Sequence, residues 1–570
     1  MFLFDKIDMK LKTFKTFFYT TIGKKQARIL LALSSVFILF QLVHLIAPFF
    51  IEKFVDEIQN NRFSLTYPKI LFYMYSLSFL FGSLLSYVYG KTYMRAKNDM
   101  DVCITHKIMQ LNPQYIKTKG EGFFSGLMER SLDSIMSLLT PLSVNTFFSL
   151  FQNFIVIALL FFKSVPIGIV CSLLFFLYFL SYLLNTKLFS TILTDFIEKS
   201  STSTSLIYDF IKGNKTILAS ESSLDFATER IKTILTITRK IEFKLQYLFD
   251  LLFTFIGRFI QPVMNLVIIG LLGKNVVDGS MTFGAFVLVI TYYNILQSGL
   301  NSFENITNMM FHAEGALESI DSFILSQSQN ERKKIDRDRV DYFYRFEDCS
   351  LKFNETLILD AENVELALNQ TSCFVGLSGQ GKSSIVNMLL GLQNPDSGSL
   401  NFLNKNNNCT EVWPLEEIAF FSQNPEIFNM SLKENIFLGD AVDEAEYERL
   451  VQLVELEKLK ERNLGSGGEH ISGGEKQRLA LARFLYQLTV KNKAFFIIDE
   501  AFVSLDFYTK EKMLALTAEA VKGKTGICIT HDDAVFQALG DKVLLCNKEN
   551  KLVLKDKIKG KNLKDYLDAE

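Results

Sequence analysis

Hydrophobic positions are concentrated in the first 310 residues, where six runs of about 20 mostly apolar residues alternate with polar segments. A helix of that length crosses the roughly 30 Å hydrocarbon layer of a bilayer. The runs lie near residues 28–50, 70–90, 143–162, 165–185, 247–272 and 282–303. The pattern predicts six transmembrane helices and disfavours a soluble helical protein.

Basic residues set the expected orientation of these helices. They crowd the segment before the first run and the long segment 186–246, whereas the turn 163–166 forms a short hairpin. Because basic residues stay on the cytoplasmic side, both termini and the loops 91–142 and 186–246 should be cytoplasmic. Abundant Lys, Asn and Phe are typical of an AT-rich bacterial genome. We therefore expect a multi-pass protein of the bacterial inner membrane.

A second domain is expected after the last apolar run. Beyond Phe323 the chain becomes charged and polar, and short β-like runs follow. This change predicts a membrane domain over residues 1–330 and a separate α/β domain over 335–570. The formal net charge of −2 argues against nucleic acid as a partner, and the seven cysteines contain no CxxC pair.

A phosphate-binding loop is predicted at the start of the second domain. Between the β-like run 371–375 and an apolar helix lies GLSGQGKS, which fits G-x-x-x-x-G-K-[ST]. Glycines let backbone N–H groups wrap a phosphate, while the lysine reaches the β and γ phosphates and the following serine ligates Mg²⁺. The residues expected to hold ATP and Mg²⁺ here are Gly376, Ser378, Gly379, Gln380, Gly381, Lys382, Ser383 and Ser384.

Two adjacent carboxylates follow a buried strand further along the chain. The run 494–498 is wholly apolar and ends in Asp499 and Glu500. In a parallel sheet this position lies beside the phosphate loop, so Asp499 would hold Mg²⁺ through water and Glu500 would polarise the attacking water. An ordinary acidic turn at a strand end is the alternative interpretation.

A third motif indicates the protein family to which the second domain is similar. The segment ISGGEKQR at 471–478 resembles the LSGGQ-x-QR signature of ATP-binding cassettes. This resemblance implies that Gln423 is the Q-loop glutamine, at Mg²⁺ and at the catalytic centre, that His531 is the switch histidine, and that Phe353 stacks on adenine. It also implies further ATP contacts from Ser472, Gly473, Gly474 and Glu475 and from Asp506 in the D-loop, Ser504-Leu505-Asp506. Glu475 departs from the family, which usually has Gln there, and Ser466 stands where similar exporters have a glutamate.

Six spans followed by one cassette are similar to the type IV ABC exporter half-transporters, and the resemblance covers almost the whole chain. It implies a membrane all-α six-helix domain followed by an α/β P-loop NTPase domain that hydrolyses ATP with Mg²⁺. It also implies dimerisation, because the signature of one cassette caps the nucleotide of the other. Intact catalytic residues favour a homodimer over a heterodimer. Segments 113–124 and 205–215 would couple the two domains.

Polar residues inside the last two spans point to a transport pathway. They recur at helical spacing and would line one face of each helix. Bonding between helices is the alternative role. The candidate residues are Arg258, Gln261, Asn265, Asn294, Gln297, Asn301 and Glu304.

The expected cargo is a mature peptide. Segments 185–188 and 283–286 look similar to exporters of microcin and lasso antimicrobial peptides, and no cysteine peptidase segment precedes the spans. A lipid or lipid-linked oligosaccharide flippase and a multidrug exporter are the alternatives. A nucleotide-gated sensor that transports nothing is a different class, and the presence of Glu500 and His531 argues against it.

Overall fold

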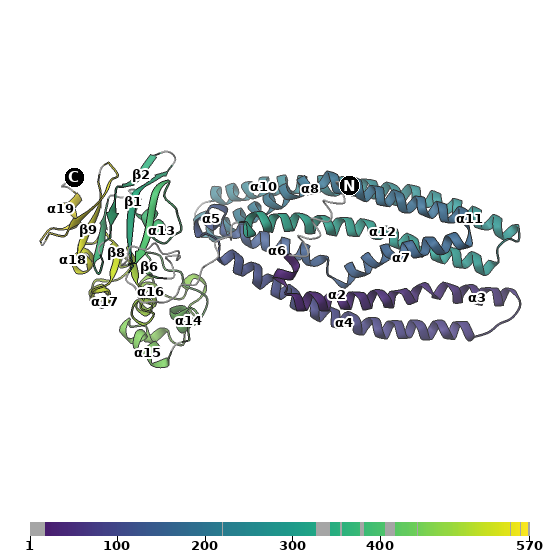
Figure 1. The fold of residues 1–570 in the computed structure, drawn as a ribbon, viewed down its shortest axis with the longest axis horizontal. Helices are drawn as coiled ribbons and strands as arrows, with labels where there is room; N and C mark the ends of the chain where they lie inside the picture. Colours follow the sequence, from purple (N-terminus) through teal and green to yellow (C-terminus); the bar gives the residue numbers. More distant parts are fainter. Residues whose placement is uncertain are drawn as a thin grey trace. The chain divides into compact units, whose positions relative to one another are not determined.

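The computed structural model describes residues 17–218, 221–326, 342–353, 356–366, 368–376, 381–404, 417–441, 443–547, 549–558 and 560–567. The chain divides into two compact units, Met1–Asn330 and Glu331–Glu570. The first unit is helical and the second contains two β-sheets covered by helices (Figure 1).

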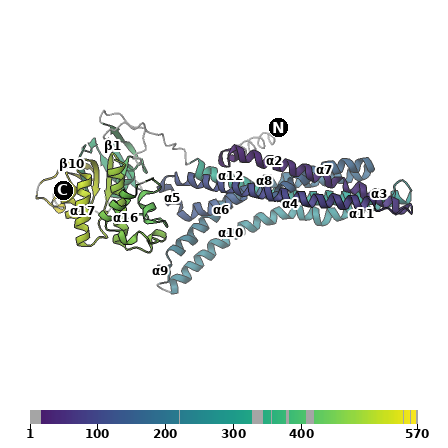
Figure 2. The same ribbon diagram turned by 90° about the horizontal axis from the view of Figure 1, so that it is seen from below.

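The helical unit is built around long antiparallel helices. Helix α12 packs against α3, α6, α7 and α8, and α8 also packs against α10. The short helix α9 lies at the turn between α8 and α10 (Figure 2). The helices are α2 (Lys24–Gln41), α3 (Ala47–Gln59), α4 (Thr66–Met109), α5 (Pro113–Lys119), α6 (Glu121–Ser137), α7 (Pro141–Lys163), α8 (Val165–Lys212), α9 (Asn214–Ile217), α10 (Glu221–Phe255), α11 (Gln261–Val277) and α12 (Phe283–Ile320). The short turns are the 3₁₀ turn η1 (Leu42–Leu45) and the π-helical turns η2 (Ile256–Ile260) and η3 (Asp321–Leu325).

Five segments among the described residues are long and apolar enough to cross a membrane: Thr66–Met109, Gly122–Lys163, Val165–Leu184, Phe253–Val277 and Phe283–Leu325. They overlap the last five predicted spans. Several continue well beyond the hydrocarbon thickness, since 44 residues of helix extend for about 66 Å.

We expected one continuous helix over the first predicted span, 28–50, but the structure does not have one there. It is divided into α2, η1 and α3, with Pro48 in the first turn of α3. Proline lacks an N–H and its ring collides with the preceding turn, so the helix is interrupted there. The Leu45 carbonyl accepts a hydrogen bond from the buried Tyr292 hydroxyl of α12 at 2.7 Å. The break is thus satisfied by a neighbouring helix, as a membrane interior requires.

Small residues bring α6 and α8 close together. A Cβ on Gly122 would lie 2.9 Å from the Ser205 Cα, and one on Gly126 would lie 3.1 Å from the Thr204 Cβ. Segment 113–124, one of the two expected coupling segments, contains α5, and segment 205–215 contains the end of α8 and the start of α9. Their role in coupling stays a prediction.

The second unit has a six-stranded sheet in the order β10-β9-β4-β8-β7-β6, in which all neighbours are parallel except β10 and β9. Its strands are β4 (Thr371–Val375), β6 (Ile418–Phe421), β7 (Phe495–Asp499), β8 (Thr525–Ile529), β9 (Lys542–Cys546) and β10 (Leu552–Asp556). An antiparallel sheet pairs β1 (Tyr342–Phe353) with β2 (Thr356–Ala361), β3 (Val364–Glu365) and β5 (Ser397–Asn404).

The parallel strands are buried on both faces, which explains their continuous apolar sequences. Alternate residues of β4 enter different cores, with Cys373 and Val375 in one and Phe374 in the other. The surrounding helices are α13 (Lys382–Leu389), α14 (Leu432–Phe437), α15 (Glu444–Leu453), α16 (Gly473–Leu485), α17 (Phe507–Val521), α18 (Asp533–Leu539) and α19 (Leu563–Leu567). Shorter turns are η5 (Glu457–Leu459), η6 (Ser466–Gly468) and η7 (Tyr486–Val490).

Candidate nucleotide site

Four neighbouring parallel strands bring the predicted catalytic residues to one edge of the sheet. Because β4, β8, β7 and β6 are in parallel register, their carboxyl ends meet at the same edge. The residues that follow these strands are Gly376, His531, Glu500 and Gln423. Segments separated by more than 100 residues along the chain therefore build one site, at the edge where ligands bind in open α/β sheets.

The phosphate loop ends at Gly381, which caps helix α13. Its φ of +73° is the left-handed conformation, and a Cβ there would overlap the Ile358 side chain. Only glycine tolerates both conditions. Lys382 and Ser383 then begin the helix, and Ser384 lies in the same turn. Ser378, Gly379 and Gln380 lie outside the described residues, so their expected phosphate contacts stay predictions.

Glu500 lies at the centre of a polar network. Its Oε2 accepts a hydrogen bond from Gln423 Nε2 at 2.9 Å, and its Oε1 lies 3.2 Å from His531 Nε2 and 3.6 Å from Lys382 Nζ. Lys382 Nζ also contacts His531 Nε2. Three sequence motifs therefore converge on this one carboxylate.

The backbone of Glu500 is in an unusual conformation that holds its carboxylate in place. Its φ of 44° is left-handed, which is uncommon for a residue other than glycine, and its N–H donates to the Ile529 carbonyl at 2.9 Å. Such strained residues are concentrated at functional sites.

Gln477 is a further residue of the site, to which the sequence assigned no role. Its Nε2 donates to the Gln423 carbonyl at 2.6 Å and so fixes the Q-loop.

Asp499 is suited to a cation. Burial, followed by the charge of Glu500, raises the pKa of Asp499 to about 6, against the opposing effect of Lys382. A desolvated carboxylate gains more from a bound cation than an exposed one does. No group of three metal-binding His, Cys, Asp or Glu side chains occurs among the described residues. The oxygen donors here are the Asp499 carboxylate and the Ser383 hydroxyl. This donor set fits Mg²⁺, which keeps several waters and uses phosphate oxygens.

The signature segment forms the N-terminus of helix α16. Ser472 and Glu475 make a reciprocal capping box: the Ser472 N–H and hydroxyl donate to Glu475 Oε2 at 2.7 and 2.8 Å, and the Glu475 N–H donates to Ser472 Oγ at 3.3 Å. The backbone hydrogen bond from Ser472 is the main cause that holds the pKa of Glu475 below its ordinary value. The unusual Glu475 is therefore an anionic helix cap.

The signature and the D-loop pack against each other. A Cβ on Gly473 or Gly474 would lie 3.4–3.6 Å from atoms of Ser504. Asp506 caps helix α17 by accepting the Thr509 N–H at 3.1 Å. Within the described part of the chain, no hydrogen bond joins Ser472 or Glu475 to the Glu500 network. Their expected ATP contacts, like that of Phe353, whose side chain lies outside the described part, stay predictions.

The predicted polar wall in the membrane unit is divided into two sets. Gln261 is buried and accepts from the Tyr178 hydroxyl at 3.1 Å. Gln297 Nε2 donates to Asn265 Oδ1 at 2.7 Å and to the Tyr293 hydroxyl at 3.0 Å. These residues join helices, as the alternative interpretation held. The second set is exposed in the single chain and consists of Arg258, Asn294, Asn301 and Glu304.

Comparison with known families matches both units. Residues 30–300 match the family described as ABC transporter transmembrane region, and residues 359–503 match the family described as ABC transporter. The two matches together cover more than two thirds of the chain. They agree with the two-unit division and with the nucleotide motifs.

Individual relatives match over part of their length. The lactococcin-A transport/processing ATP-binding protein LcnC of Lactococcus lactis subsp. lactis is 28% identical over 270 residues, which are 45% of this chain and 37% of the relative. The ATP-dependent lipid A-core flippase of Vibrio parahaemolyticus is 26% identical over 287 residues, 48% of this chain and 49% of the relative. The chain thus spans between about a third and a half of these curated relatives.

The fold of the whole chain has a solved counterpart. The structure of a bacterial Atm1-family ABC exporter with ATP bound superimposes with a TM-score of 0.76 at 18% identity, covering 94% of this chain and 95% of that one. At this identity the likeness concerns the fold alone.

Proposed function

Because this chain belongs to the ABC transporters, with a transmembrane region followed by an ATP-binding domain, we propose that it uses ATP hydrolysis to export a substrate. The site of export is the bacterial inner membrane, with the termini and the ATP-binding unit in the cytoplasm. The observation that carries the proposal is the contact of Glu500 with Lys382, Gln423 and His531.

This network supplies the groups that ATP hydrolysis needs. Lys382 binds the β and γ phosphates at the start of helix α13, where the helix dipole also favours an anion. Glu500 orients and deprotonates the attacking water, and Gln423 and His531 hold its carboxylate and the γ-phosphate region. Mg²⁺, held by Ser383, Asp499 and Gln423, would neutralise the phosphate charge. A sensor that only binds nucleotide has no need of this complete set.

The working unit is a dimer, for which a second copy of this chain is the simplest partner. Ser472 and Asp506 are exposed, and within the described part of the chain no hydrogen bond joins either of them to the Glu500 network. The proposal places them over the nucleotide of the partner. A heterodimer with another half-transporter would differ by requiring a second gene product for turnover.

The surface of α12 favours a polar cargo. Between Thr291 and Met310, every exposed position of this helix is polar, namely Asn294, Ser298, Asn301, Glu304, Asn305 and Asn308. In contrast, the exposed positions of α4 include Phe72, Leu80 and Leu84, which suit lipid. Since polar groups facing acyl chains are costly, the α12 face is directed to water or protein. Asparagine amides donate and accept hydrogen bonds, as peptide groups do, so we propose a mature peptide as cargo.

Reconstitution in nanodiscs tests the function. Wild type should hydrolyse ATP, Glu500→Gln should lose at least about a hundredfold in turnover, and peptides should stimulate the wild type. Stimulation by lipid A or lipid-linked sugars instead would make the chain a flippase, and stimulation by apolar drugs would make it a multidrug exporter. Turnover that appears only with a second half-transporter identifies a heterodimer, and nucleotide binding without turnover identifies a sensor.

The polar face can be tested separately. Asn301→Leu and Arg258→Gln should weaken cargo stimulation while leaving the unstimulated ATPase intact. Ser298→Leu at the same face serves as a second probe, and Leu266→Ala on the exposed apolar surface of α11 is the matched control. Full stimulation in Asn301→Leu would exclude the α12 face from the pathway, and full stimulation in Arg258→Gln would exclude Arg258, which lies in the turn η2.

A further inference from the structure

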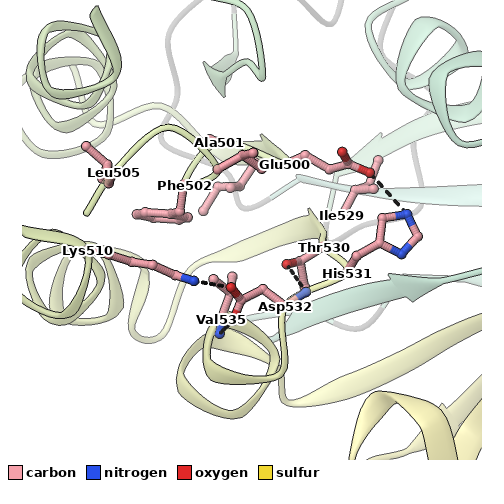
Figure 3. Close-up of a pocket in the computed structure, with 12 residues that line it drawn as sticks. Glu500, Ala501, Phe502, Leu505, Lys510, Ile529, Thr530, His531, Asp532 and Val535 are labelled. Atoms are coloured by element: carbon pink, nitrogen blue, oxygen red, sulfur yellow. Dashed lines mark hydrogen bonds and ion pairs between the residues drawn. The ribbon is translucent and has the colours of Figure 1, made fainter. Parts of the chain in front are cut away.

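A second polar contact lies at a cavity that Glu500 and His531 also line. This cavity of about 300 Å³ is lined by Glu500 and the segment after it and by the segment around His531 (Figure 3). Lys510 of α17 reaches across it and forms an ion pair with Asp532. The Lys510 side chain is 22% exposed, so this pair is less accessible than most ion pairs of the surface. The motifs of the nucleotide site assign no role to either residue.

Asp532 fixes the backbone on the C-terminal side of His531. Its carboxylate caps α18 by accepting the Ala534 N–H at 2.9 Å and the Val535 N–H at 3.4 Å. Its own N–H donates to the buried Thr530 Oγ1 at 3.0 Å, so the residues on both sides of His531 are tied to each other.

The charge balance supports a formed pair. Burial acts to raise the pKa of Asp532, but the Lys510 ammonium and the two backbone N–H groups outweigh it and hold this pKa below its ordinary value. Asp532 is therefore an anion at neutral pH, and Lys510 is its cationic partner. The pair connects α17, which starts after the D-loop residue Asp506, to the loop that carries His531.

We infer that Lys510 is a positioning residue for ATP hydrolysis, which holds the His531 loop at the distance at which His531 meets Glu500. The inference rests on the proposed function. The pair also gives the D-loop a direct mechanical connection to the switch histidine, because Asp506 and Lys510 lie one turn apart on α17. A shift of the D-loop on dimer closure is then transmitted to the 3.2 Å contact between His531 and Glu500.

The kinetic test uses the full-length protein in nanodiscs. Lys510→Met should lower kcat about tenfold with KM for ATP unchanged, because misplacing a catalytic group affects the transition state more than ground-state binding. Lys510→Arg, which keeps the cation, should recover to within about threefold of wild type. Lys512→Met is the matched control, since Lys512 lies on the same helix and pairs with Glu455 away from the site. It should keep the wild-type kcat.

A double-mutant cycle separates the pair from general destabilisation. Asp532→Asn removes the charge but retains a good helix cap, so α18 should remain folded. If the two residues act through their contact, Lys510→Met in the Asp532→Asn background should lower kcat little further. Additive losses, or an unchanged kcat in Lys510→Met, would overturn the inference.

A measurement independent of turnover keeps the two proposals distinguishable. Modification of His531 by diethyl pyrocarbonate, followed by mass spectrometry, reports how firmly its ring is held. Lys510→Met should speed this modification several-fold, and Lys512→Met should not. Equal rates in Lys510→Met and wild type refute the positioning role even if the protein shows no ATPase. An inactive wild type with a faster Lys510→Met modification rate refutes only the proposed ATP-driven function.

Discussion

Replacing Gly284 by alanine should disturb the packing of the first span against the last. Gly284 lies in the first turn of α12, and its N–H donates to Asp56 Oδ1 at 2.9 Å. An added Cβ would overlap the Asp56 carboxylate and lie 2.5 Å from the Glu52 carbonyl oxygen. The carboxylate can rotate away, but the backbone of α3 cannot, so α3 must move away from α12.

The expected cost follows from three terms. Overpacking costs about 1–3 kcal/mol, and loss of the capping interaction with Asp56 costs about 1 kcal/mol. Alanine returns about 1 kcal/mol through its higher helix propensity. The net destabilisation is about 2 kcal/mol, which should lower the unfolding midpoint of the purified protein by several degrees.

Thermal unfolding followed by size-exclusion chromatography in detergent measures this effect. Gly273→Ala is the control, because no atom lies within 4 Å of its added Cβ in helix α11, and it should melt at or above the wild-type temperature. Asp56→Asn, which can still accept the Gly284 N–H, should fall between wild type and Gly284→Ala. If Gly284→Ala and Gly273→Ala melt together, the close contact between α3 and α12 is refuted.

Three further outcomes concern the ATP-binding unit. Gly381→Ala should weaken ATP binding at least about tenfold in a nucleotide-binding assay, because a Cβ is unfavourable at its left-handed φ and would overlap the Ile358 side chain. Wild-type affinity for ATP in this variant would contradict the prediction. Without Mg²⁺, the raised pKa of Asp499, about 6, means that the folded state binds the proton more tightly than the unfolded state does. The free energy of unfolding of wild type should therefore fall by up to about 3 kcal/mol relative to that of Asp499→Asn as the pH rises from 4 to 7. A difference between the two proteins that stays constant with pH would contradict this prediction. Glu475→Ala should destabilise the protein by about 1 kcal/mol by removing the capping box of Ser472, whereas Glu475→Gln should not, and equal melting of the two variants would argue against the cap.

Much of the architecture could be predicted because its physical causes are local. Membrane spans require long apolar runs, and five of the six predicted runs overlap segments that are long and apolar enough to cross. The ATP-binding family was correctly identified from short motifs, since a phosphate loop and a signature each need particular residues at fixed spacing. The interruption of the first span was missed, although Pro48 was visible in the sequence. The interruption is accepted there because Tyr292 donates a hydrogen bond to the Leu45 carbonyl, and these two residues are 247 positions apart.

The role of the polar residues in the membrane could not be resolved from spacing alone. Gln297 and Asn294 have the same spacing pattern, yet Gln297 bonds Asn265 across two helices and Asn294 is exposed. Helical periodicity predicts which residues lie on the same face of a helix, but not whether that face contacts another helix or is exposed. That depends on how the helices pack against one another, which is a property of the whole unit.

That the chain has a membrane part and an ATP-binding part follows from the amino-acid sequence alone, because apolar length and motif spacing are properties of contiguous residues. The contacts of Glu500 with Gln423, Lys382 and His531 depend on the fold, since parallel pairing of β4, β8, β7 and β6 brings distant loops to one edge. The fold also places Lys510 against Asp532 and Gln477 against the Q-loop. These contacts join residues separated by 22 and 54 positions, and although Gln477 lies in the signature segment, no motif indicated either contact.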